Sequence, residues 1–305
     1  MPCYHPLTAW RARYTNPSGK RPLVFKRRDG IPNTETQVGC GRCIGCRLEY
    51  SRQWAIRCMH ENQMHDWSSF ITLTYDDEHL PFGGTLYPKH LTDFWKRLRA
   101  KLGIKLLYFA CGEYGEKLER PHYHACIFGW DFPDRYHWRT SHGHPLYRSD
   151  TLEALWTFGN SEIGEVTFES AAYVARYVTK KVNGDRAQSH YERVDLETGE
   201  VFSLLPEFTR MSLKPAIGKT WLEKFGSEVY PSDEVVVNGK QVKPPRYYDG
   251  LLERRDPELY GVLKESRLSA AKESPDNTPE RLRVREKVKE AQLATMSNLS
   301  RNLGE

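Results

Sequence analysis

Residues 120–130 read RPHYHACIFGW. After the proline, the run consists of aromatic, small and apolar residues that favour a buried or half-buried β-strand. Because alternate side chains of a strand share a face, His122 and His124 are predicted to lie side by side, with Tyr123 and Ala125 on the other face. The strand rise separates such a pair by about 7 Å, so both imidazoles could bind one metal ion. An isolated pair of this kind also fits a solvated polar face, and the neighbouring segments decide between the two.

Two further strands and a helix are predicted just before this stretch. Residues 68–75 (SSFITLTY) and 104–115 (IKLLYFACGEYG) are rich in strand-forming residues. Between them, residues 90–103 (HLTDFWKRLRAKLG) carry apolar side chains at helical spacing and end at a glycine, which is typical of a helix terminus.

The polar loop at residues 116–120 predicts an antiparallel hairpin between the second strand and the histidine strand. Glu113, at the end of the second strand, would then lie beside the two histidines. Glu116 and Glu119, in the same loop, are alternatives for a carboxylate at this position.

Residues 170–182 (SAAYVARYVTKKV) predict a helix with two different faces. The small and aliphatic side consists of Ala171, Val174, Ala175, Val178 and Val182. The other side consists of Tyr173, Tyr177, Lys180 and Lys181, with Arg176 at the margin. Tyrosines four residues apart project alike, one turn above the other. Tyrosine pairs on helices often pack on a sheet, but the aliphatic side is the better candidate for core here, which leaves the tyrosines and lysines available for chemistry.

Residues 40–46 read CGRCIGC, in which three cysteines have C-x2-C-x2-C spacing. Cys40, Cys43 and Cys46 would bind zinc tetrahedrally if Cys3 or His5 supplied a fourth ligand. Reduced thiols without metal are an alternative, and an iron–sulfur cluster is disfavoured because no proline follows the run. A structural zinc clip would anchor an N-terminal arm that has little core of its own.

Other segments are interpreted as structural. Residues 131–150 are expected to form a polar loop, and residues 163–168 (IGEVTF) a strand. A plain polar insertion is favoured over a second metal site in this loop, although it contains His137, His142 and His144. Residues 216–220 (AIGKT) resemble the end of a phosphate-binding loop, but a leucine stands where the first glycine should be, which excludes an ATPase.

The chain has 305 residues, 39% of them apolar, which is enough for one large domain with appendages. It has no run of eighteen apolar residues and no signal-peptide pattern, so a soluble protein without a membrane partner is expected. A net charge of +5 permits a nucleic-acid partner, for which a local basic patch is needed. We expect a Cys-rich arm and helix at residues 1–66, a main domain at 67–250, and a charged, helical or partly disordered tail at 251–305.

The histidine pair, Glu113 and the tyrosine and lysine face form one candidate site. Two imidazoles and a carboxylate with open positions suit Mg²⁺ or Mn²⁺, or Zn²⁺, as a Lewis acid on a phosphoryl oxygen. A tyrosine hydroxyl could then attack phosphorus, with lysines stabilising the phenolate and the phosphate charge. The products would be a covalent phosphotyrosine and a free hydroxyl on the DNA, and the second tyrosine could attack a second strand junction.

Three motifs in this order, FITLTY, GEYGEKLERPHYHACIFG and YVARYVTKK, resemble those of the HUH (His-hydrophobe-His) rolling-circle replication initiators. With the cysteine cluster, the chain is most similar to the initiators of microvirus (gokushovirus-type) single-stranded-DNA bacteriophages. The resemblance covers roughly residues 40–250. The conjunction of the three motifs is specific, although each alone is weak. Tyr123 departs from the pattern, because it is aromatic where the family has an aliphatic residue.

The resemblance implies an α+β nuclease domain, with a central antiparallel sheet flanked by helices in a ferredoxin- or RRM-like topology. Such a protein nicks one strand at a replication origin, keeps the 5′-phosphate on tyrosine, leaves a 3′-hydroxyl primer, and later transfers and ligates the strand. Its partners would be single-stranded origin DNA and the host helicase and DNA polymerase, in the host bacterial cytoplasm. A host helicase is expected because no helicase domain is recognised in the chain.

Residue by residue, the resemblance assigns His122, His124 and Glu113 to a divalent metal, Mg²⁺ or Mn²⁺. Tyr173 and Tyr177 match the nucleophiles, and Lys180 the lysine that follows the second tyrosine, with Lys181 beside it. Thr72 and Thr74 lie in the first motif, which family members use structurally or in DNA contact. The residues expected at the DNA are Thr72, Thr74, Arg120 and Arg176.

Two other functions compete with this one. A non-catalytic, zinc-stabilised single-stranded-DNA-binding protein would use the aromatic and lysine side chains for stacking and phosphate contact. An HUH transposase or relaxase would share the chemistry, but two tyrosines on one helix and the short chain favour the phage initiator.

Overall fold

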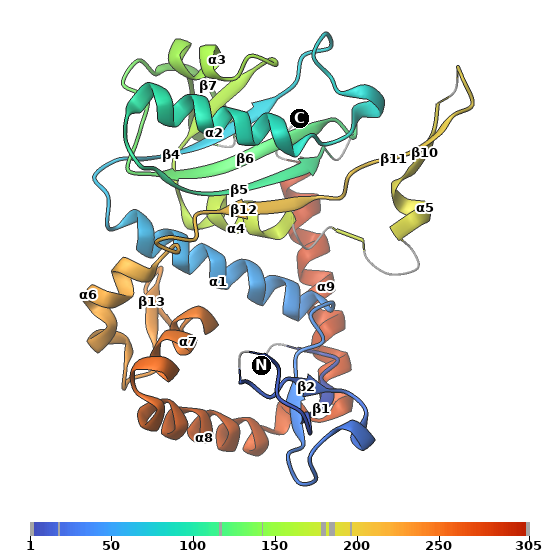
Figure 1. Ribbon diagram of the computed structural model, residues 1–305, viewed down its shortest axis with the longest axis vertical. Helices are drawn as coiled ribbons and strands as arrows, with labels where there is room; N and C mark the ends of the chain where they lie inside the picture. Colours follow the sequence, from blue (N-terminus) through green and yellow to red (C-terminus); the bar gives the residue numbers. More distant parts are fainter. Residues whose placement is uncertain are drawn as a thin grey trace. The chain divides into compact units, whose positions relative to one another are not determined.

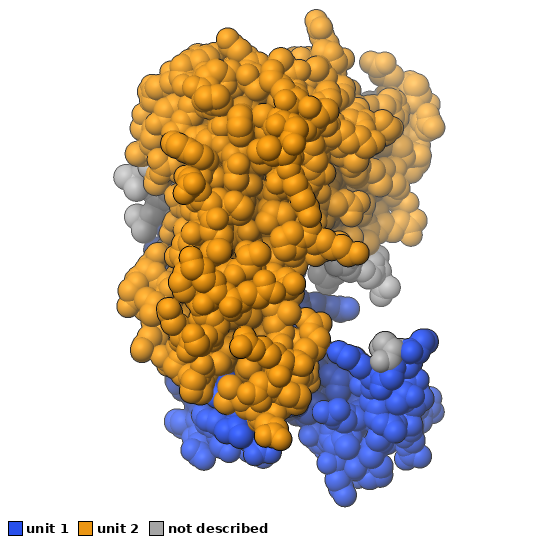
Figure 2. All heavy atoms as spheres, turned by 60° about the vertical axis from the view of Figure 1, so that its left-hand side comes forward, with its two compact units in different colours: residues 1–50, 261–305 blue, residues 51–260 orange. Residues whose placement is uncertain are grey.

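The computed structural model describes residues 3–17, 19–115, 118–141, 143–177, 181–182, 187–195 and 197–302. The chain divides into two compact units, which Figure 2 shows in different colours: residues 1–50 with 261–305, and residues 51–260. The three parts expected from the sequence, with boundaries after residues 66 and 250, stay a prediction.

A seven-stranded antiparallel sheet is the centre of the unit at residues 51–260 (Figure 1). The strand order is β12-β5-β6-β4-β9-β8-β7. The strands are β4 (Ser68–Thr74), β5 (Leu107–Tyr114), β6 (Pro121–Phe128), β7 (Tyr136–Ser141), β8 (His144–Arg148), β9 (Ser161–Gly164) and β12 (Phe208–Met211). This sheet, with helices packed on it, confirms the expected α+β class.

The middle of the sheet follows the order β4, α2 (Pro88–Leu102), β5, β6, α3 (Asp150–Leu155), β9. Its four strands are arranged β5-β6-β4-β9, so β6 lies between two strands that a helix connects. This is the β-α-β-β-α-β arrangement with a split β-α-β unit that is typical of ferredoxin-like sheets. The expected hairpin is present, and its register pairs Glu113 with His122.

The main hydrophobic core lies between α2 and one face of the sheet. Leu91, Phe94 and Leu98 recur at helical spacing and are fully or almost fully buried against the strands. The helix ends where Gly103 adopts a left-handed conformation, φ 65°, and donates its backbone N–H to the carbonyl of Arg99. Tyr123, between the two histidines in sequence, points into this core and is completely buried.

The opposite face of the sheet is covered by α4 (Phe168–Tyr177) and the later part of α1 (Ile44–Asn62); Figure 1 shows α2 and α4 on opposite sides. The expected aliphatic side of α4 is buried, as Val174 and Ala175 demonstrate. The two helices are joined where the Ser51 hydroxyl donates to the carbonyl of Ala172 at 2.7 Å. This face carries the candidate site.

Two sequence expectations were wrong. Residues 131–150 were expected to be a loop, but Tyr136–Ser141 and His144–Arg148 pair as the hairpin β7–β8. The residues of β7 are strand formers without apolar alternation, because this edge strand is exposed along most of its length. The strand expected over residues 163–168 ends at Gly164, and Phe168 already begins α4.

The remaining elements of this unit lie outside the seven-stranded sheet; Figure 1 shows α6, α7 and β13 on the far side of α1 from it. The helices are α5 (Ala187–Tyr191), α6 (Lys219–Val229) and α7 (Arg246–Arg255), with the short 3-10 helix η2 (Phe82–Gly84). Two small hairpins are β10 (Glu192–Val194) with β11 (Val201–Ser203), and β13 (Val235–Val237) with β14 (Lys240–Val242).

The other unit contains a three-stranded sheet of order β2-β1-β3. Its elements are β1 (Leu7–Arg11), β2 (Leu23–Val24), η1 (Arg27–Asp29), β3 (Thr36–Val38), most of α8 (Pro257–Glu273), η4 (Pro275–Asn277) and α9 (Pro279–Asn302). Leu282 of α9 is buried, and the His5 ring lies 2.6 Å from the carboxylate of Glu286. Across the described residues, no helix combines the length and the apolar character needed to cross a membrane.

His60 is a buried histidine of α1 that packs against α6 and α7, within the unit at residues 51–260. Its ring stacks on Trp221 at 3.5 Å between centroids, and its Nδ1 lies 2.9 Å from the Tyr248 hydroxyl. Burial lowers the pKa of His60 from 6.5 to about 4. The unfolded chain therefore binds a proton more tightly than the folded chain does.

We expect wild-type protein to lose up to about 3 kcal/mol of unfolding free energy as the pH falls from 6.5 to 4, because each unit of pKa shift is worth about 1.36 kcal/mol. This stability is fully present above pH 6.5. Denaturant unfolding of wild type and of His60→Gln, which does not titrate, measures the difference. Equal pH dependence of the two proteins would contradict the assignment.

Candidate functional site

The central strands bring the predicted residues into two adjacent rows on one face of the sheet. In the first row, Glu113 of β5 pairs with His122 of β6, and His122 pairs with Thr74 of β4. In the second row, His124 lies between Cys111 and Thr72. The period of two along a strand puts both histidines and both threonines on the same side.

Glu113 connects this face to α4. Its Oε1 atom lies 2.8 Å from Nε2 of His124 and accepts a hydrogen bond from the Tyr173 hydroxyl at 3.1 Å. The Tyr173 ring also meets the His124 ring edge to face, with 5.0 Å between centroids. Glu113 and His124 are buried, at 3% and 7% exposure. A predicted metal ligand and a predicted nucleophile therefore share one buried carboxylate oxygen.

His122 is oriented by the backbone of its own hairpin. Its Nδ1 donates to the carbonyl of Arg120 at 2.7 Å, because a carbonyl can only accept. Burial, and then the nearby His124, lower the pKa of His122. The ring is thus held neutral with its lone pair on Nε2, which is the form that binds a metal ion.

Thr72 and Phe70 of β4 fix the position of His124. The Thr72 hydroxyl lies 3.0 Å from Nδ1 of His124, and the Phe70 ring stacks on the imidazole with 7° between planes. Thr72 was expected to act structurally or at the DNA, and Phe70 had no expected role. Their two-residue spacing in a strand next to His124 is the signal that could have found this contact.

The side chains of Thr74 and Arg120 also have partners within the protein. The Thr74 hydroxyl donates to the carbonyl of Asn160 at 3.3 Å. Arg120 donates to Asp77 at 2.6 Å and to the carbonyl of Tyr75 at 3.0 Å. The Thr74 contact joins β4 to the residue just before β9, and the Arg120 contacts join the β5–β6 hairpin to the segment after β4. Both residues thus shape the site from within the fold.

The remaining expected residues lie on or after α4. Arg176 is exposed, with its guanidinium 6.0 Å from the centre of the Tyr173 ring. Tyr177 is the last residue of α4, one turn after Tyr173, and its side chain is outside the described part of the structure. Lys180 and Glu116 lie outside the described residues, and Lys181 is half-buried.

His122, His124 and Glu113 are a suitable donor set for a divalent cation, because imidazole and carboxylate ligands both bind Mn²⁺ and Zn²⁺. The 2.8 Å between His124 Nε2 and Glu113 Oε1 is close to the about 3 Å that separates adjacent ligands with bonds of about 2.1 Å. The two imidazole rings are 6.3 Å apart and nearly parallel. Binding by all three ligands therefore requires His122 to come closer to the other two.

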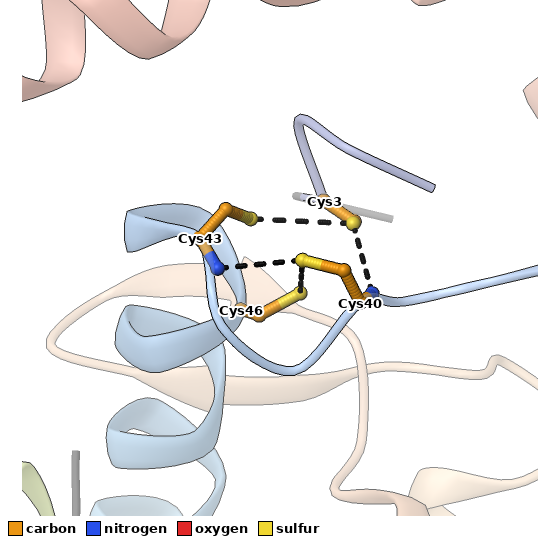
Figure 3. Close-up of side chains that lie close together, drawn as sticks. All are labelled: Cys3, Cys40, Cys43 and Cys46. Atoms are coloured by element: carbon orange, nitrogen blue, oxygen red, sulfur yellow. Dashed lines mark hydrogen bonds between the residues drawn. The ribbon is translucent and has the colours of Figure 1, made fainter. Parts of the chain in front are cut away.

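A four-cysteine cluster is the second candidate metal site (Figure 3). The Sγ atoms of Cys3, Cys40, Cys43 and Cys46 all lie within 4.8 Å of one another, and none forms a disulfide. Two of the separations, Cys3 to Cys43 and Cys40 to Cys46, are 4.0 Å. Four thiolates around zinc, with bonds of about 2.3 Å, would be about 3.8 Å apart. The fourth member of the cluster is therefore Cys3 and not His5, the other candidate for a fourth ligand.

Backbone N–H groups donate hydrogen bonds to sulfur atoms of this cluster. Cys40 accepts from the backbone N–H of Cys43 and of Arg42 at 3.3 and 3.4 Å. Burial opposes ionisation, but these donors lower the pKa of Cys40 to about 7. Within the part of the chain that the structure describes, this is the only group of three or more metal-type ligands at such spacing, and it does not include His137 or His144.

The fold and site define an α+β protein with a split β-α-β sheet, a buried histidine–glutamate–tyrosine cluster and a four-cysteine cluster. The family model described as replication-associated protein ORF2/G2P matches residues 68–182, which contain every strand of the seven-stranded sheet except β12, together with α4. The chain belongs to this family of phage replication-associated proteins, and the resemblance to phage replication initiators is confirmed.

Individual relatives support this membership. The chain is 40% identical over 232 residues to replication-associated protein VP4 of Bdellovibrio phage phiMH2K, covering 72% of this chain and 69% of the relative. It is 35% identical to replication-associated protein ORF2 of Spiroplasma virus 4, covering 77% and 74%. Replication-associated protein ORF4 of Chlamydia phage 1 is 30% identical, covering 78% and 61%. No solved structure matches the chain.

The four-cysteine cluster predicts that purified protein contains about one tightly held zinc ion per chain, measured by mass spectrometry of the metal. Cys40→Ser is expected to lose this zinc and to lower the unfolding temperature. Cys126→Ser, which removes a buried thiol elsewhere, and His5→Ala, which removes the alternative ligand, are expected to retain it. Zinc loss in His5→Ala, or retention in Cys40→Ser, would contradict the four-thiol site.

Proposed function

We propose that this protein initiates rolling-circle replication by nicking single-stranded origin DNA with a tyrosine nucleophile. The observation that carries the proposal is the contact of the Tyr173 hydroxyl with Glu113, at 3.1 Å, on the same oxygen that lies 2.8 Å from His124. A nucleophile, a proton acceptor and a metal ligand are thereby within hydrogen-bond reach of one another. Membership of the replication-associated family supplies DNA as the substrate class.

In the proposed step, the Tyr173 oxygen attacks the phosphorus of one phosphodiester. A bond forms between the tyrosine oxygen and phosphorus, and the bond from phosphorus to the 3′-oxygen breaks. The tyrosine proton passes to Glu113, and the departing 3′-oxygen takes a proton from solvent to become the primer hydroxyl. One phosphate ester replaces another, so a later attack by a 3′-hydroxyl can reverse the step and ligate the strand.

His122, His124 and Glu113 would hold a divalent cation, Mg²⁺ or Mn²⁺. When bound, this cation would supply Lewis-acid stabilisation of charge on the scissile phosphate. Thr72 and the carbonyl of Arg120 would keep the two imidazoles in the orientation that ligation requires.

Tyr177 would be the second nucleophile, because it follows Tyr173 by one helical turn. Lys180 and Lys181 would stabilise negative charge on the phosphate and the phenolate. Arg176, exposed beside Tyr173, would bind the DNA backbone, whereas Thr74 and Arg120 would act on the DNA indirectly by shaping the site. We further propose that the protein acts in the host cytoplasm, with a host helicase and DNA polymerase.

Mixing the protein with single-stranded origin DNA and Mn²⁺ is expected to give a nicked strand and a protein–DNA adduct. Tyr173→Phe should lower formation of the first adduct at least about a thousandfold, because the nucleophile is lost. Mass mapping of the DNA-linked peptide in Tyr173→Phe and Tyr177→Phe separately identifies the attacking residue. Tyr136→Phe, which changes an exposed tyrosine on β7, is the matched control.

Absence of any adduct or nick with each of several divalent metals would overturn the proposal. The competing, non-catalytic DNA-binding function predicts a different outcome, in which replacing both His122 and His124 by alanine changes neither DNA affinity nor any other activity.

Thr72→Val keeps the side-chain volume but removes the hydroxyl that contacts His124. We expect it to weaken Mn²⁺ binding about 10- to 100-fold, as is typical when a residue that orients a metal ligand is removed. Titration of Mn²⁺ by electron paramagnetic resonance measures this without DNA. Thr92→Val, on α2 across the sheet, should bind Mn²⁺ as wild type does; equal loss in both variants would show a general loss of structure.

A further inference from the structure

The positive charge of the chain is concentrated outside the candidate nicking site. Residues 1–50 contain nine lysines and arginines against three acidic residues, an excess of six, whereas the whole chain has a net charge of only +5. Within them, residues 11–28 (RARYTNPSGKRPLVFKRR) contain seven lysines and arginines and no acidic residue. Residues 51–260, which carry the histidines, Glu113 and Tyr173, have 27 basic and 30 acidic residues.

Backbone contacts hold this segment in one small structure, formed by β1, β2 and η1. Arg11 of β1 is paired with Leu23 of β2, and the N–H of Ala12 donates to the carbonyl of Pro22 at 2.8 Å. The end of β1 also contacts the end of η1, because the N–H of Arg13 donates to the carbonyl of Asp29 at 3.2 Å. The cations at the end of β1, the start of β2 and in η1 are thereby gathered at one end of the sheet. We call residues 11–28 the basic hairpin.

Close packing of η1 on β1 makes this arrangement specific. A Cβ atom added to Gly30, just after η1, would lie 2.3 Å from the Cβ of Trp10, a distance that no side chain tolerates. Glycine therefore lets the two segments approach. In addition, Arg21 donates to the carbonyl of Arg13 at 2.8 Å, and Arg13 donates to the carbonyl of Gly30 at 3.0 Å.

The cations of the basic hairpin face solvent. All seven are exposed: Arg11, Arg13, Lys20, Arg21, Lys26, Arg27 and Arg28. In the described part of the chain, Arg28 with Asp29 is the one ion pair among them, at 3.6 Å. Lysines and arginines that are exposed and close together, with a single described ion pair among them, suit the binding of a polyanion.

Two aromatic side chains accompany these cations. Tyr14 and Phe25 are each 59% exposed, so both rings are accessible beside the cations. Alternation of cations with exposed aromatic rings is typical of surfaces that bind single strands, where phosphates contact the cations and bases stack on the rings.

We propose that the basic hairpin binds single-stranded DNA through its phosphates and bases, as a second DNA-binding site distinct from the nicking site. The inference rests on the proposed function only in taking single-stranded DNA as the partner. The hairpin would bind without regard to sequence, since phosphate contacts carry no sequence information. It would supply electrostatic attraction for DNA, which residues 51–260, with more acidic than basic residues, do not supply as a whole.

The test measures binding of a single-stranded oligonucleotide that lacks the origin sequence, by fluorescence anisotropy at several salt concentrations. The variant Lys20→Gln/Lys26→Gln/Arg27→Gln removes three cations whose side chains make no described hydrogen bond. Each phosphate contact to a single strand contributes about 0.7 to the slope of log affinity against log salt, so three lost contacts lower the slope by about 2. The same arithmetic gives a loss of affinity of roughly a hundredfold at 0.1 M salt.

The matched control, Lys101→Gln/Lys105→Gln/Lys240→Gln, removes three exposed lysines from residues 51–260 and changes the net charge equally. It should bind nearly as wild type does. Tyr14→Ala/Phe25→Ala should lower the affinity with an unchanged salt slope, because stacking is lost but phosphate contacts remain. Zinc content and unfolding temperature of every variant report whether the fold is intact.

An unchanged affinity and slope in the hairpin variant, or an equal loss in the control, would overturn the proposal. So would a variant that loses binding to anionic lipid vesicles but not to DNA. The hairpin variant should nick saturating origin DNA at the wild-type rate, whereas Tyr173→Phe should bind DNA normally without nicking. The basic hairpin and the proposed nuclease can thus fail independently.

Discussion

The architecture of the site depends on one buried carboxylate. Glu113 is almost completely buried, and a charge in such a position is tolerated only when donors surround it. His124 and Tyr173 approach the same oxygen from two different elements, β6 and α4. Glu113 therefore couples the register of the hairpin to the position of α4 on the sheet. A one-residue slip of β6 would move both histidines to the opposite face and leave this carboxylate without its imidazole.

The sequence predicted the elements whose periodicity is set by a core. Alternate side chains of a strand share a face and helical side chains repeat every 3.6 residues, so the faces of His122 on β6 and Tyr173 on α4 followed directly. The hairpin β7–β8 was missed because its edge strand, β7, buries little and leaves no apolar alternation to recognise. Arg120 was assigned to DNA, and its contacts with Asp77 and Tyr75 depend on long-range packing that no local pattern indicates.

The four-cysteine cluster also combines a part that the local sequence predicts with a part that only the tertiary structure determines. The spacing of Cys40, Cys43 and Cys46 predicted three ligands that one turn of chain brings together. The fourth could be Cys3 or His5, two residues apart, and only the fold distinguishes them, because the backbone N–H of Cys40 contacts the sulfur of Cys3 while His5 contacts Glu286. Sequence spacing determines local ligands, whereas distant ones are selected by tertiary structure.

Charge and chemistry are allocated to different parts of this chain. A site built on buried histidines and a buried glutamate gains reactivity from exclusion of water, but the carboxylates that such a site requires repel a polyanion. The excess of acidic residues in residues 51–260 is consistent with this conflict. The exposed cations of residues 11–28 would offset this repulsion, because they would add attraction for DNA to that of the few cations proposed at the nicking site. The basic excess of residues 1–50 and the acidic excess of residues 51–260 partly cancel in the net charge of the whole chain. Composition alone was therefore uninformative about the partner.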